Sequence, residues 1–390
     1  MRFLLLAALA VPLASAQIAI QGDTVYTMAG APLRNAVVLI RDGKIEQVGP
    51  AASIPIPSGY KKLTAKVVTP GLIDAHTVVG LTGYLNQPQD QDMVERSAPM
   101  QPELRAIDAY DPKERLLEWV RGFGVTTIHT GHGPGVLVSG QTMIIKTNAP
   151  VADAAMVPAA MVAATLGDGA RAEPGKSPGS RSKAIAMLRA ELIKAQEFIR
   201  KPGARDLRTE AFARVVKGEL PLLVTVHRAN DIMSTIRLAK EFNLKLVLDG
   251  VAEAPEILDQ IKASGYPVIV HPTMYRSAGD AQNLSMETAS KLKAAGIPFA
   301  MQSGFEGYVP KTRVILFEAA VAAANGLKFD DALASITIDA ASLLGIDKRV
   351  GSLAAGKDGD VALYDGDPFE YTTHCVGVVI DGVVVSEEKR

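Results

Sequence analysis

A repeated unit in the middle of the chain limits the possible folds more than any other sequence feature. In this unit a helical pattern ends at Gly or Asn and an apolar strand follows at once; the closing residues are Gly124, Asn243, Gly265 and Gly296. Gly and Asn accept the left-handed conformation that closes a helix. Apolar runs without alternation are typical of strands that are buried on both faces of a parallel sheet. Over residues 67–349 the repeat predicts an α/β fold, a (β/α)8 TIM-like barrel, which takes about 250 residues.

An open, doubly wound sheet is the alternative for the same region. That architecture commonly carries a G-x-G-x-x-G motif after its first strand, and no such motif follows a strand here. The barrel is therefore favoured, although the pattern does not place its third and fourth strands.

Two similar hairpins lie near opposite ends of the chain. Residues 37–48 turn at Asp42-Gly43, and residues 376–385 turn at Asp381-Gly382. Asp-Gly suits the type I′ turn of a two-residue hairpin. Because an isolated hairpin is marginally stable in water, we expect both to share a small β-sandwich domain built from residues 17–66 and 350–390. The barrel would then be inserted between the two halves of this domain.

Residues 1–16 have the pattern of a secretory signal peptide. Arg2 precedes an apolar run, and Ala14-x-Ala16 is a typical cleavage pattern. The apolar run is shorter than the roughly 20 residues that a membrane-spanning helix needs. We therefore expect an exported protein, periplasmic or secreted, with no transmembrane anchor after the signal is removed.

Charge and cysteine content exclude several classes of partner and site. Lys and Arg total 41 against 42 for Asp and Glu, and no basic stripe of the kind that binds nucleic acid is evident. The single cysteine, Cys375, can form neither an intrachain disulfide nor a Cys-rich zinc site. A small-molecule substrate or ligand is the expected partner. The sequence leaves open whether the protein forms a homo-oligomer.

Five of the six histidines follow expected barrel strands. They are His76, His129, His132, His227 and His271. Barrel enzymes keep their active sites at the carboxyl ends of the strands. A single histidine at such a place can equally be a buried structural group, but the convergence of five favours a binding or catalytic pocket. His374 lies in the terminal β-domain and is taken as incidental.

Several segments resemble the amidohydrolase superfamily, and within it the imidazolonepropionase-like branch. The segments are residues 68–76 (VTPGLIDAH), 124–127 (GVTT), 227–232 (HRANDI) and 341–365. The resemblance covers essentially the whole chain after residue 16. It implies a metal-bearing (β/α)8 barrel with a β-sandwich made from both termini. It also implies hydrolysis of carbon–nitrogen bonds other than peptide bonds, cyclic amides among them.

At the metal positions the chain departs from the family pattern. The resemblance implies one or two divalent metals held by a His-x-His pair on the first strand, a Lys or Glu on strand three or four, histidines on strands five and six, and an Asp on strand eight. Val78 stands at the second His of the pair, and Thr225 precedes His227 where related chains can carry another histidine. Asp249 and Gly250 stand nearest the strand-six His, and Ser303 stands at the strand-eight Asp.

The remaining candidate metal ligands are His76 and His227, with His129, His132 and Asp168 as further candidates. Asp168 could replace a bridging carboxylate. A catalytic zinc ion needs three protein ligands and a water molecule, so the sequence predicts that zinc binds weakly, unless a rearranged site forms on the same rim.

The candidate catalytic residues are His227, Asp249 and His271. One hypothesis is an exported amidohydrolase-like hydrolase with an altered or incomplete metal site. A second is an inactive pseudoenzyme that keeps the fold as a small-molecule-binding or scaffolding protein. A third is a metal-free hydrolase in which His227 acts with Asp231 or Ser303.

Two polar segments have open functions. Residues 86–92 (NQPQDQD) could bind a hard cation through oxygen or form a solvated acidic loop. Residues 167–183, rich in Gly, Pro and Ser, could be a surface loop or a lid over the barrel mouth.

Overall fold

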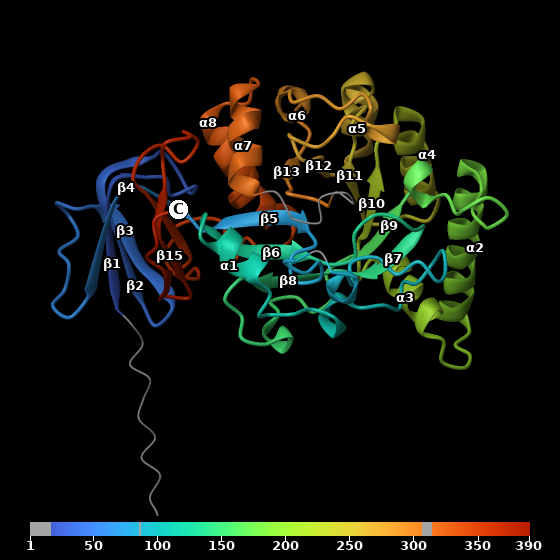
Figure 1. Ribbon diagram of the computed structural model, residues 1–390, viewed down its shortest axis with the longest axis horizontal. Helices are drawn as coiled ribbons and strands as arrows, with labels where there is room; N and C mark the ends of the chain where they lie inside the picture. Colours follow the sequence, from blue (N-terminus) through green and yellow to red (C-terminus); the bar gives the residue numbers. More distant parts are fainter. Residues whose placement is uncertain (1–16, 86, 306–313) are drawn as a thin grey trace, which may run out of the picture.

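The computed structural model describes residues 17–85, 87–305 and 314–390, so the expected signal segment lies outside the described residues. A seven-stranded sheet, at the left in Figure 1, stands beside a larger barrel surrounded by helices. The strand β4 (Lys61–Pro70) belongs to the sheet and leads directly into β5 (Leu72–Thr77), the first barrel strand. In sequence, the barrel is therefore inserted between the N-terminal and the C-terminal strands of the sheet.

The seven-stranded sheet contains strands from both ends of the chain. Its order is β16-β15-β14-β4-β1-β2-β3. Besides β4, its strands are β1 (Ile18–Val25), β2 (Leu33–Arg41), β3 (Lys44–Pro50), β14 (Val361–Tyr364), β15 (Cys375–Ile380) and β16 (Val383–Ser386). Both expected hairpins, β2–β3 and β15–β16, therefore lie in one sheet, as predicted. The domain boundaries at residues 66/67 and 349/350 stay a prediction.

The two Asp-Gly turns contact each other through Gly359. Gly359 N donates to Gly43 O at 2.8 Å, and Gly382 N donates to Gly359 O at 3.1 Å. A Cβ added to Gly43 would lie 3.0 Å from Asp381 O, so a side chain there would push the turns apart. Apolar residues of β1, β2, β14 and β15 pack together in one cluster. The sheet therefore curls around a shared core.

A buried lysine joins this sheet to the barrel. Lys146 Nζ lies 2.7 Å from Asp358 Oδ2 and 3.1 Å from Asp360 Oδ1, and it also contacts the carboxylate of Asp381. Lys44, which is half exposed, contacts the other oxygen of Asp358 at 2.5 Å. Burial raises the pKa of Asp360 to about 6, although Lys146 opposes this shift. Burial would also raise the pKa of Asp358, but hydrogen bonds from Lys146 and Lys44 lower it to about 2.

The wall of the barrel has eight strand positions, which we call staves; β7 (Val138–Gln141) and β8 (Met143–Lys146) together occupy the third. Besides β5 and this pair, the strands are β6 (Val125–Thr130), β9 (Val162–Thr165), β10 (Leu222–Val226), β11 (Leu246–Gly250), β12 (Val268–Val270) and β13 (Phe299–Met301). The strands β9 to β13 pair in parallel, and β5 pairs in parallel with β6. A parallel bridge between Thr77 and Gly304 joins the first stave to the end of the last.

The third stave differs from the parallel strand that a regular (β/α)8 barrel would have. Only Thr142 separates β7 from β8; β8 runs antiparallel to β6, and β7 runs antiparallel to β9. A parallel crossover needs a dozen or more residues, and residues 131–137 between β6 and β7 are too few. The chain therefore returns along the barrel in the opposite direction.

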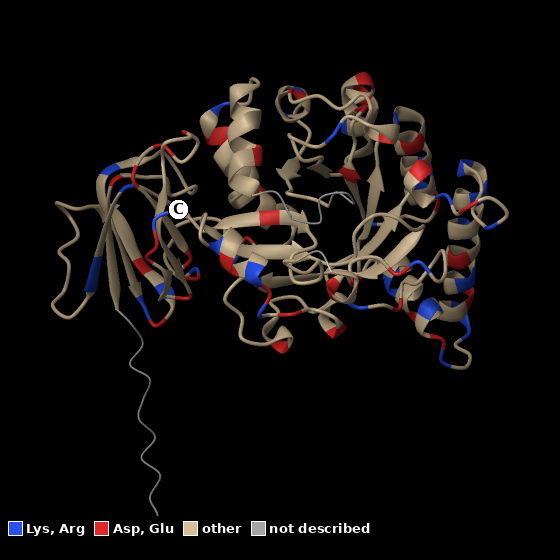
Figure 2. Ribbon diagram, in the orientation of Figure 1, with Lys and Arg blue, Asp and Glu red and all other residues tan. Residues whose placement is uncertain are grey.

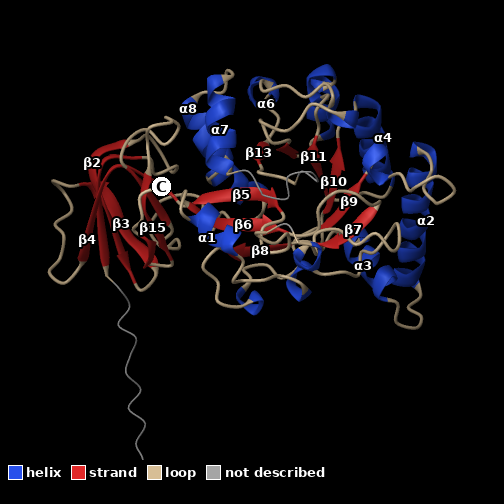
Figure 3. Cartoon of the chain, in the orientation of Figure 1, coloured by secondary structure: helices blue, strands red, loops and turns tan. Residues whose placement is uncertain are grey.

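Helices surround the barrel (Figure 3). They are α1 (Arg115–Arg121), α2 (Arg181–Arg200), α3 (Leu207–Val216), α4 (Ala229–Glu241), α5 (Leu258–Ser264), α6 (Thr288–Ala295), α7 (Ile315–Ala324), α8 (Phe329–Ser335) and α9 (Ile338–Leu343). The four expected helix-closing residues all have positive φ, from 52° at Asn243 to 97° at Gly124. The strands β6, β11, β12 and β13 follow them, which confirms the helix-to-strand units.

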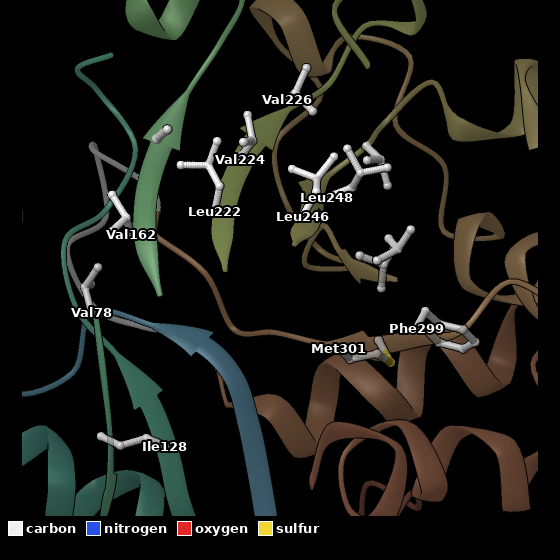
Figure 4. Packing of buried hydrophobic residues seen from close by; sticks show 14 of the residues in the cluster. Val78, Ile128, Val162, Leu222, Val224, Val226, Leu246, Leu248, Phe299 and Met301 are labelled. Atoms are coloured by element: carbon white, nitrogen blue, oxygen red, sulfur yellow. The ribbon is translucent and has the colours of Figure 1, made fainter. Parts of the chain in front are cut away.

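The outer helices carry both charge signs, and their inner faces are apolar. Figure 2 shows acidic and basic residues interleaved along α2. Outward-facing residues of β10 and β11, such as Leu222, Val224 and Leu248, belong to the large core between strands and helices (Figure 4). Among the described residues, no helix combines the length and apolar character needed to cross a bilayer.

The barrel interior changes from apolar to polar along the strands. Leu223, Val247, Ile269 and Ala300 form an interior cluster that α9 residues complete. Side chains two residues apart on a strand share a face. The next inward residues are therefore Thr225, Asp249, His271 and Gln302, all buried. This alternation places a polar layer at the carboxyl ends of the strands, above an apolar floor.

Candidate active site

A small pocket, about 30 Å³ in volume, opens at this polar layer. Its polar lining residues are His76, Thr77, Thr225, His227, Asp249, His271, Tyr275 and Gln302. Its other lining residues are Val78, Pro134, Gly250, Pro272, Gly304 and Phe305. Three of the five expected histidines, together with Asp249, therefore line one pocket.

An irregularity in β5 turns His76 towards the pocket. Ile73 and Ala75 face the barrel interior, so a regular strand would direct His76 the other way. The pairing of β5 with β6 shifts register between Asp74 and Thr77. A bulge of this kind re-aims side chains and is common next to functional sites. The shift brings His76 into the same wall as Asp249.

His76 and Asp249 form a buried ion pair. The Nδ1 atom of His76 lies 3.4 Å from Asp249 Oδ2, and the two residues are 3% and 2% exposed. Burial would raise the pKa of Asp249, but the charge of His76 and hydrogen bonds keep it below its ordinary value. Burial would lower the pKa of His76, but the charge and hydrogen bond of Asp249 raise it above its ordinary value. Each residue therefore favours the charged form of the other.

Two neutral side chains hold the Asp249 carboxylate in place. Thr225 Oγ1 donates to Oδ2 at 2.5 Å, and Gln302 Nε2 donates to Oδ1 at 2.5 Å. Both oxygens are thus hydrogen-bonded, and the carboxylate is fixed in the pocket wall.

His227 has a different environment from His76. Its Nδ1 atom is buried without a hydrogen-bond partner, and its ring stacks on Tyr275 at a centroid distance of 6.3 Å. Burial lowers its pKa, although the charges of Asp249 and Glu253 oppose the shift. A Cβ at Gly250, where φ is 86°, would lie 2.6 Å from His227 Cε1. Gly250 therefore leaves room for a neutral imidazole at the pocket wall.

Two further histidines have both ring nitrogens engaged. His271 lines the pocket, but its Nδ1 donates to Pro272 O at 2.8 Å and its Nε2 lies 3.0 Å from Thr288 Oγ1. Burial lowers the pKa of His271 to about 4. This histidine therefore anchors the loop after β12 and has no free lone pair for a reaction.

His129 does not line the pocket, although its ring centroid lies 5.7 Å from that of His76. Its Nδ1 donates to Ala75 O and its Nε2 contacts Thr142 Oγ1, both at 2.6 Å. Burial lowers its pKa to about 3. It joins β5, β6 and the third stave behind the site.

The other expected site residues lie outside the pocket. His132 is buried where a Cβ at Gly140 would be 2.4 Å from its ring, and burial lowers its pKa to about 4. Asp168 is half exposed and lies 3.2 Å from Arg181. Asp231 pairs with the same guanidinium at 2.8 Å, so it is not a partner of His227.

Val78 and Ser303, which the sequence places at expected metal positions, have other contacts in the structure. Ser303 Oγ donates to Asp74 Oδ2 at 2.5 Å, and Ser303 N donates to Oδ1 at 3.0 Å. Burial raises the pKa of Asp74 to about 6, although the bonds from Ser303 oppose it. Val78 presents methyl groups to the pocket. Neither residue completes a ligand set around His76.

Among the described residues, a complete ligand set for a catalytic zinc ion is not arranged around one point. His129 and His271 have both nitrogens engaged, Val78 has no lone pair, and the hydroxyl of Ser303 is bonded to Asp74. Within residues 17–85, 87–305 and 314–390, no cluster of three or more His, Cys, Asp or Glu side chains is arranged to hold a metal. A catalytic zinc site needs three such ligands.

Thr225, Tyr275, Gln302 and Phe305 are among the pocket residues that were not predicted from the sequence as functional residues. Thr225 and Gln302 could have been found from strand alternation, since each follows an interior apolar residue by two positions. Tyr275 and Phe305 lie on loops after β12 and β13, where no periodic signal marks them.

The two polar segments noted in the sequence contribute no lining residue to this pocket. Asn86 lies outside the described residues, and Gln87 to Gln89 and Asp90 are exposed. In residues 167–183, Arg181 is the most connected side chain: it contacts Asp168, Asp231 and Asp280. The proposals of a cation site and of a lid stay untested.

Comparison with known proteins assigns the family. The model of the amidohydrolase family matches residues 78–386, and the chain belongs to this family. Its relatives place it in the imidazolonepropionase-like branch. An imidazolonepropionase from Rhizorhabdus wittichii is 26% identical over 371 residues, which cover 87% of this chain and 91% of that protein. The amidohydrolase tasK of Hapsidospora irregularis is 24% identical over 88% of this chain, which spans 39% of that longer protein.

Solved structures agree with this assignment. An amidohydrolase from Thermotoga maritima superimposes with a TM-score of 0.90 at 27% identity, covering 95% of this chain and 100% of the other. An adenosine deaminase from Xanthomonas campestris with bound zinc has a TM-score of 0.54 at 16% identity and shows the fold alone. Members of the family typically use a divalent metal. Family membership supports a hydrolase that acts on carbon–nitrogen bonds.

Proposed function

We propose that this protein is an exported hydrolase of non-peptide carbon–nitrogen bonds in small molecules, cyclic amides among them, with an altered metal site. One observation carries the proposal: two imidazoles line the same pocket in different surroundings, since His76 Nδ1 lies 3.4 Å from the Asp249 carboxylate, whereas His227 Nδ1 has no hydrogen-bond partner. Asp249 raises the pKa of His76, and burial lowers the pKa of His227. Titratable groups whose environments separate their pKa values are typical of acid and base partners.

The roles follow from the protonation states. Neutral His227 accepts a proton from a water molecule as its oxygen bonds to the amide carbon. Protonated His76, held by Asp249, donates a proton to the nitrogen as the carbon–nitrogen bond breaks. The products are a carboxylic acid and an amine, or one molecule carrying both groups when the amide is cyclic. General acid–base catalysis of this kind contributes roughly 10²- to 10⁴-fold to a rate.

The proposed metal site is incomplete. His76, His227 and Asp249 are the remaining donors, and Asp249 is already bonded to Thr225 and Gln302. We expect zinc to bind weakly, and no step above requires it. Export is proposed from the signal-like pattern of residues 1–16 alone.

A panel of lactams, hydantoins and acyl-amino acids tests the function. Mature protein is assayed by product detection, beside His227→Gln and, as a matched control outside the pocket, Asp168→Asn. We expect turnover of at least one cyclic amide, its loss in His227→Gln, and its retention in Asp168→Asn. Binding without turnover of any compound would favour the alternative, a pseudoenzyme that binds small molecules or acts as a scaffold.

A further inference from the structure

A cluster of ionic contacts lies at the carboxyl ends of the strands, and Arg181, the first residue of α2, is at its centre. The guanidinium Nε lies 2.8 Å from Asp231 Oδ2, and Nη2 lies 3.0 Å from Asp280 Oδ1 and 3.2 Å from Asp168 Oδ1. Asp168 is half exposed, so its contact contributes little. The two better buried contacts join the start of α4 to the loop after β12.

Both of these carboxylates lie close in sequence to pocket residues. Asp231 follows His227 by four positions, and its side chain is 5% exposed. Asp280 follows Tyr275 by five positions, and its side chain is 10% exposed. The rings of His227 and Tyr275 stack with 6.3 Å between centroids and 16° between planes. Arg181 therefore bridges the two segments that carry the stacked rings.

The loop after β9 closes over this bridge. A Cβ added to Gly167, where φ is 85°, would lie 2.3 Å from Asp280 Oδ2 and 3.2 Å from Asp231 Oδ2. The next amide, Asp168 N, donates to the same oxygen of Asp280. Hydrogen bonds to an ionised group are roughly twice as strong as neutral ones, so the side chain of Asp280 is held in one position.

A second bridge holds the same loop farther from the pocket. Asn283 Nδ2 donates to Glu253 Oε1 at 2.9 Å, and Glu253 Oε2 accepts from Ala229 N at 2.7 Å. This bridge is attached eight positions after Tyr275, whereas the Arg181 bridge is attached five positions after it. Loss of the Arg181 bridge should therefore loosen the part of the loop near Tyr275 while the loop stays attached to α4.

We propose that Arg181 is a positioning residue for His227. Through its two buried carboxylate partners it holds Tyr275 against the imidazole, and so it keeps that imidazole oriented towards the pocket. Reacting groups must be held in a productive geometry, and a displacement of about 1 Å can lower a rate about a hundredfold. The role of His227 as the base rests on the proposed function, but the hold on its ring can be measured without turnover.

Three variants separate the bridge from its surroundings. Arg181→Gln removes the guanidinium. Asp280→Ala removes only the loop side of the bridge and leaves the contact between Arg181 and Asp231. Arg189→Gln is the matched control, because Arg189 also joins α2 to α4, which lie side by side (Figure 1). It contacts Glu241 at 2.8 Å, about two helical turns along α2 from the bridge.

The imidazole resonance of His227 is the first readout. Protein labelled with carbon-13 at histidine Cε1 gives one peak per histidine, and His227→Gln assigns the peak. At alkaline pH, where an imidazole is neutral, its position reports on the neighbouring ring. Arg181→Gln and Asp280→Ala should move the peak in the direction that Tyr275→Ala moves it, and Arg189→Gln should leave it in place. An unmoved peak in either folded bridge variant would overturn the proposal.

Turnover of the best cyclic amide is the second readout. We expect kcat to fall about tenfold to a hundredfold in Arg181→Gln and in Asp280→Ala, with a smaller change in KM. The double variant should be no slower than the slower single variant, since both changes break one bridge. A displaced His227 peak with unchanged kcat would overturn the positioning role. A wild-type protein that hydrolyses no amide would instead remove the proposed function, and the His227 peak would still decide whether Arg181 holds the stacked rings.

Discussion

His76 and His227 line the same pocket, yet the charge and hydrogen bond of Asp249 raise the pKa of His76, whereas burial lowers the pKa of His227. His76 has a carboxylate at 3.4 Å, whereas His227 has an aromatic ring and an unpartnered Nδ1. The sequence predicted that both histidines lie at strand ends. It could not predict their protonation, because that depends on burial and on the carboxylate of Asp249, which is distant in sequence from His76.

The pH dependence of the proposed reaction should respond to Asp249. His76 acts as the acid, so the rate falls as pH rises through its pKa, which the charge of Asp249 holds above its ordinary value. Asp249→Asn removes that charge, so the pKa of His76 falls and the alkaline limb of kcat/KM moves to lower pH. The measurement is kcat/KM against pH for the best cyclic amide. An alkaline limb unmoved in Asp249→Asn, with Asp168→Asn as control, would exclude the assigned role of His76.

Metal occupancy should respond to Val78 and Ser303. We expect the native protein to purify with well under one zinc per chain, since no three of the described donors are arranged to hold a metal ion. Val78→His with Ser303→Asp adds an imidazole and an anionic oxygen beside His76 and should raise occupancy, although Asp74, which bonds to Ser303, will repel the new carboxylate. Elemental analysis after dialysis against a weak chelator measures the effect, with Val78→Leu and Ser303→Ala combined as the control.

Stoichiometric zinc in the native protein would contradict the prediction that the metal site is incomplete. Equal, negligible zinc in both the native and the double-variant proteins would show either that residues 78 and 303 are not the former ligand positions or that the pocket has closed.

At the scale of single elements, the strands were predicted better than their irregularities. Helix ends at Gly124, Asn243, Gly265 and Gly296 followed from residue type, because the left-handed conformation is a local property. The bulge in β5 and the antiparallel third stave depend on pairing between distant segments. A local pattern cannot show them, although the short connection at residues 131–137 excludes a helical crossover.

Lys146, at the end of β8, should be critical for stability. Lys146→Met leaves Asp358 and Asp360 without their buried cation, which should cost about 3–5 kcal/mol in the free energy of unfolding. Asp360 has a raised pKa of about 6 even with Lys146 beside it. Without the lysine this pKa rises further, so the variant loses additional stability as pH rises through and above 6. The loss should therefore be larger at pH 8 than at pH 5, as measured by urea unfolding.

Lys44→Met is the matched control for this prediction. Lys44 contacts the same Asp358 but is half exposed, so its loss should cost less than about 1 kcal/mol. Equal losses in the two variants would show that burial of the lysine is not what matters.

At the scale of the whole molecule, the terminal sheet depends on both ends of the chain. Deleting residues 375–390 removes β15, β16 and the turn at Gly382 that packs on Gly43. Hydrogen exchange at residues 37–48 should then accelerate, although these residues are intact. Full protection in the truncated protein would show that the N-terminal strands are stable alone. Tyr371→Ser, at a fully exposed side chain before β15, serves as the control.

The contact between the two Asp-Gly turns has a consequence for biogenesis. A ribosome makes residues 42–43 more than three hundred positions before residues 381–382. While the barrel is synthesised, the N-terminal strands therefore lack their C-terminal partner strands. Closing so long a loop costs entropy, and structures dominated by such distant pairings form slowly. The barrel, once collapsed, brings β4 beside the site where β14 pairs and so shortens the remaining search. The terminal sheet should therefore be the last part of the molecule to mature.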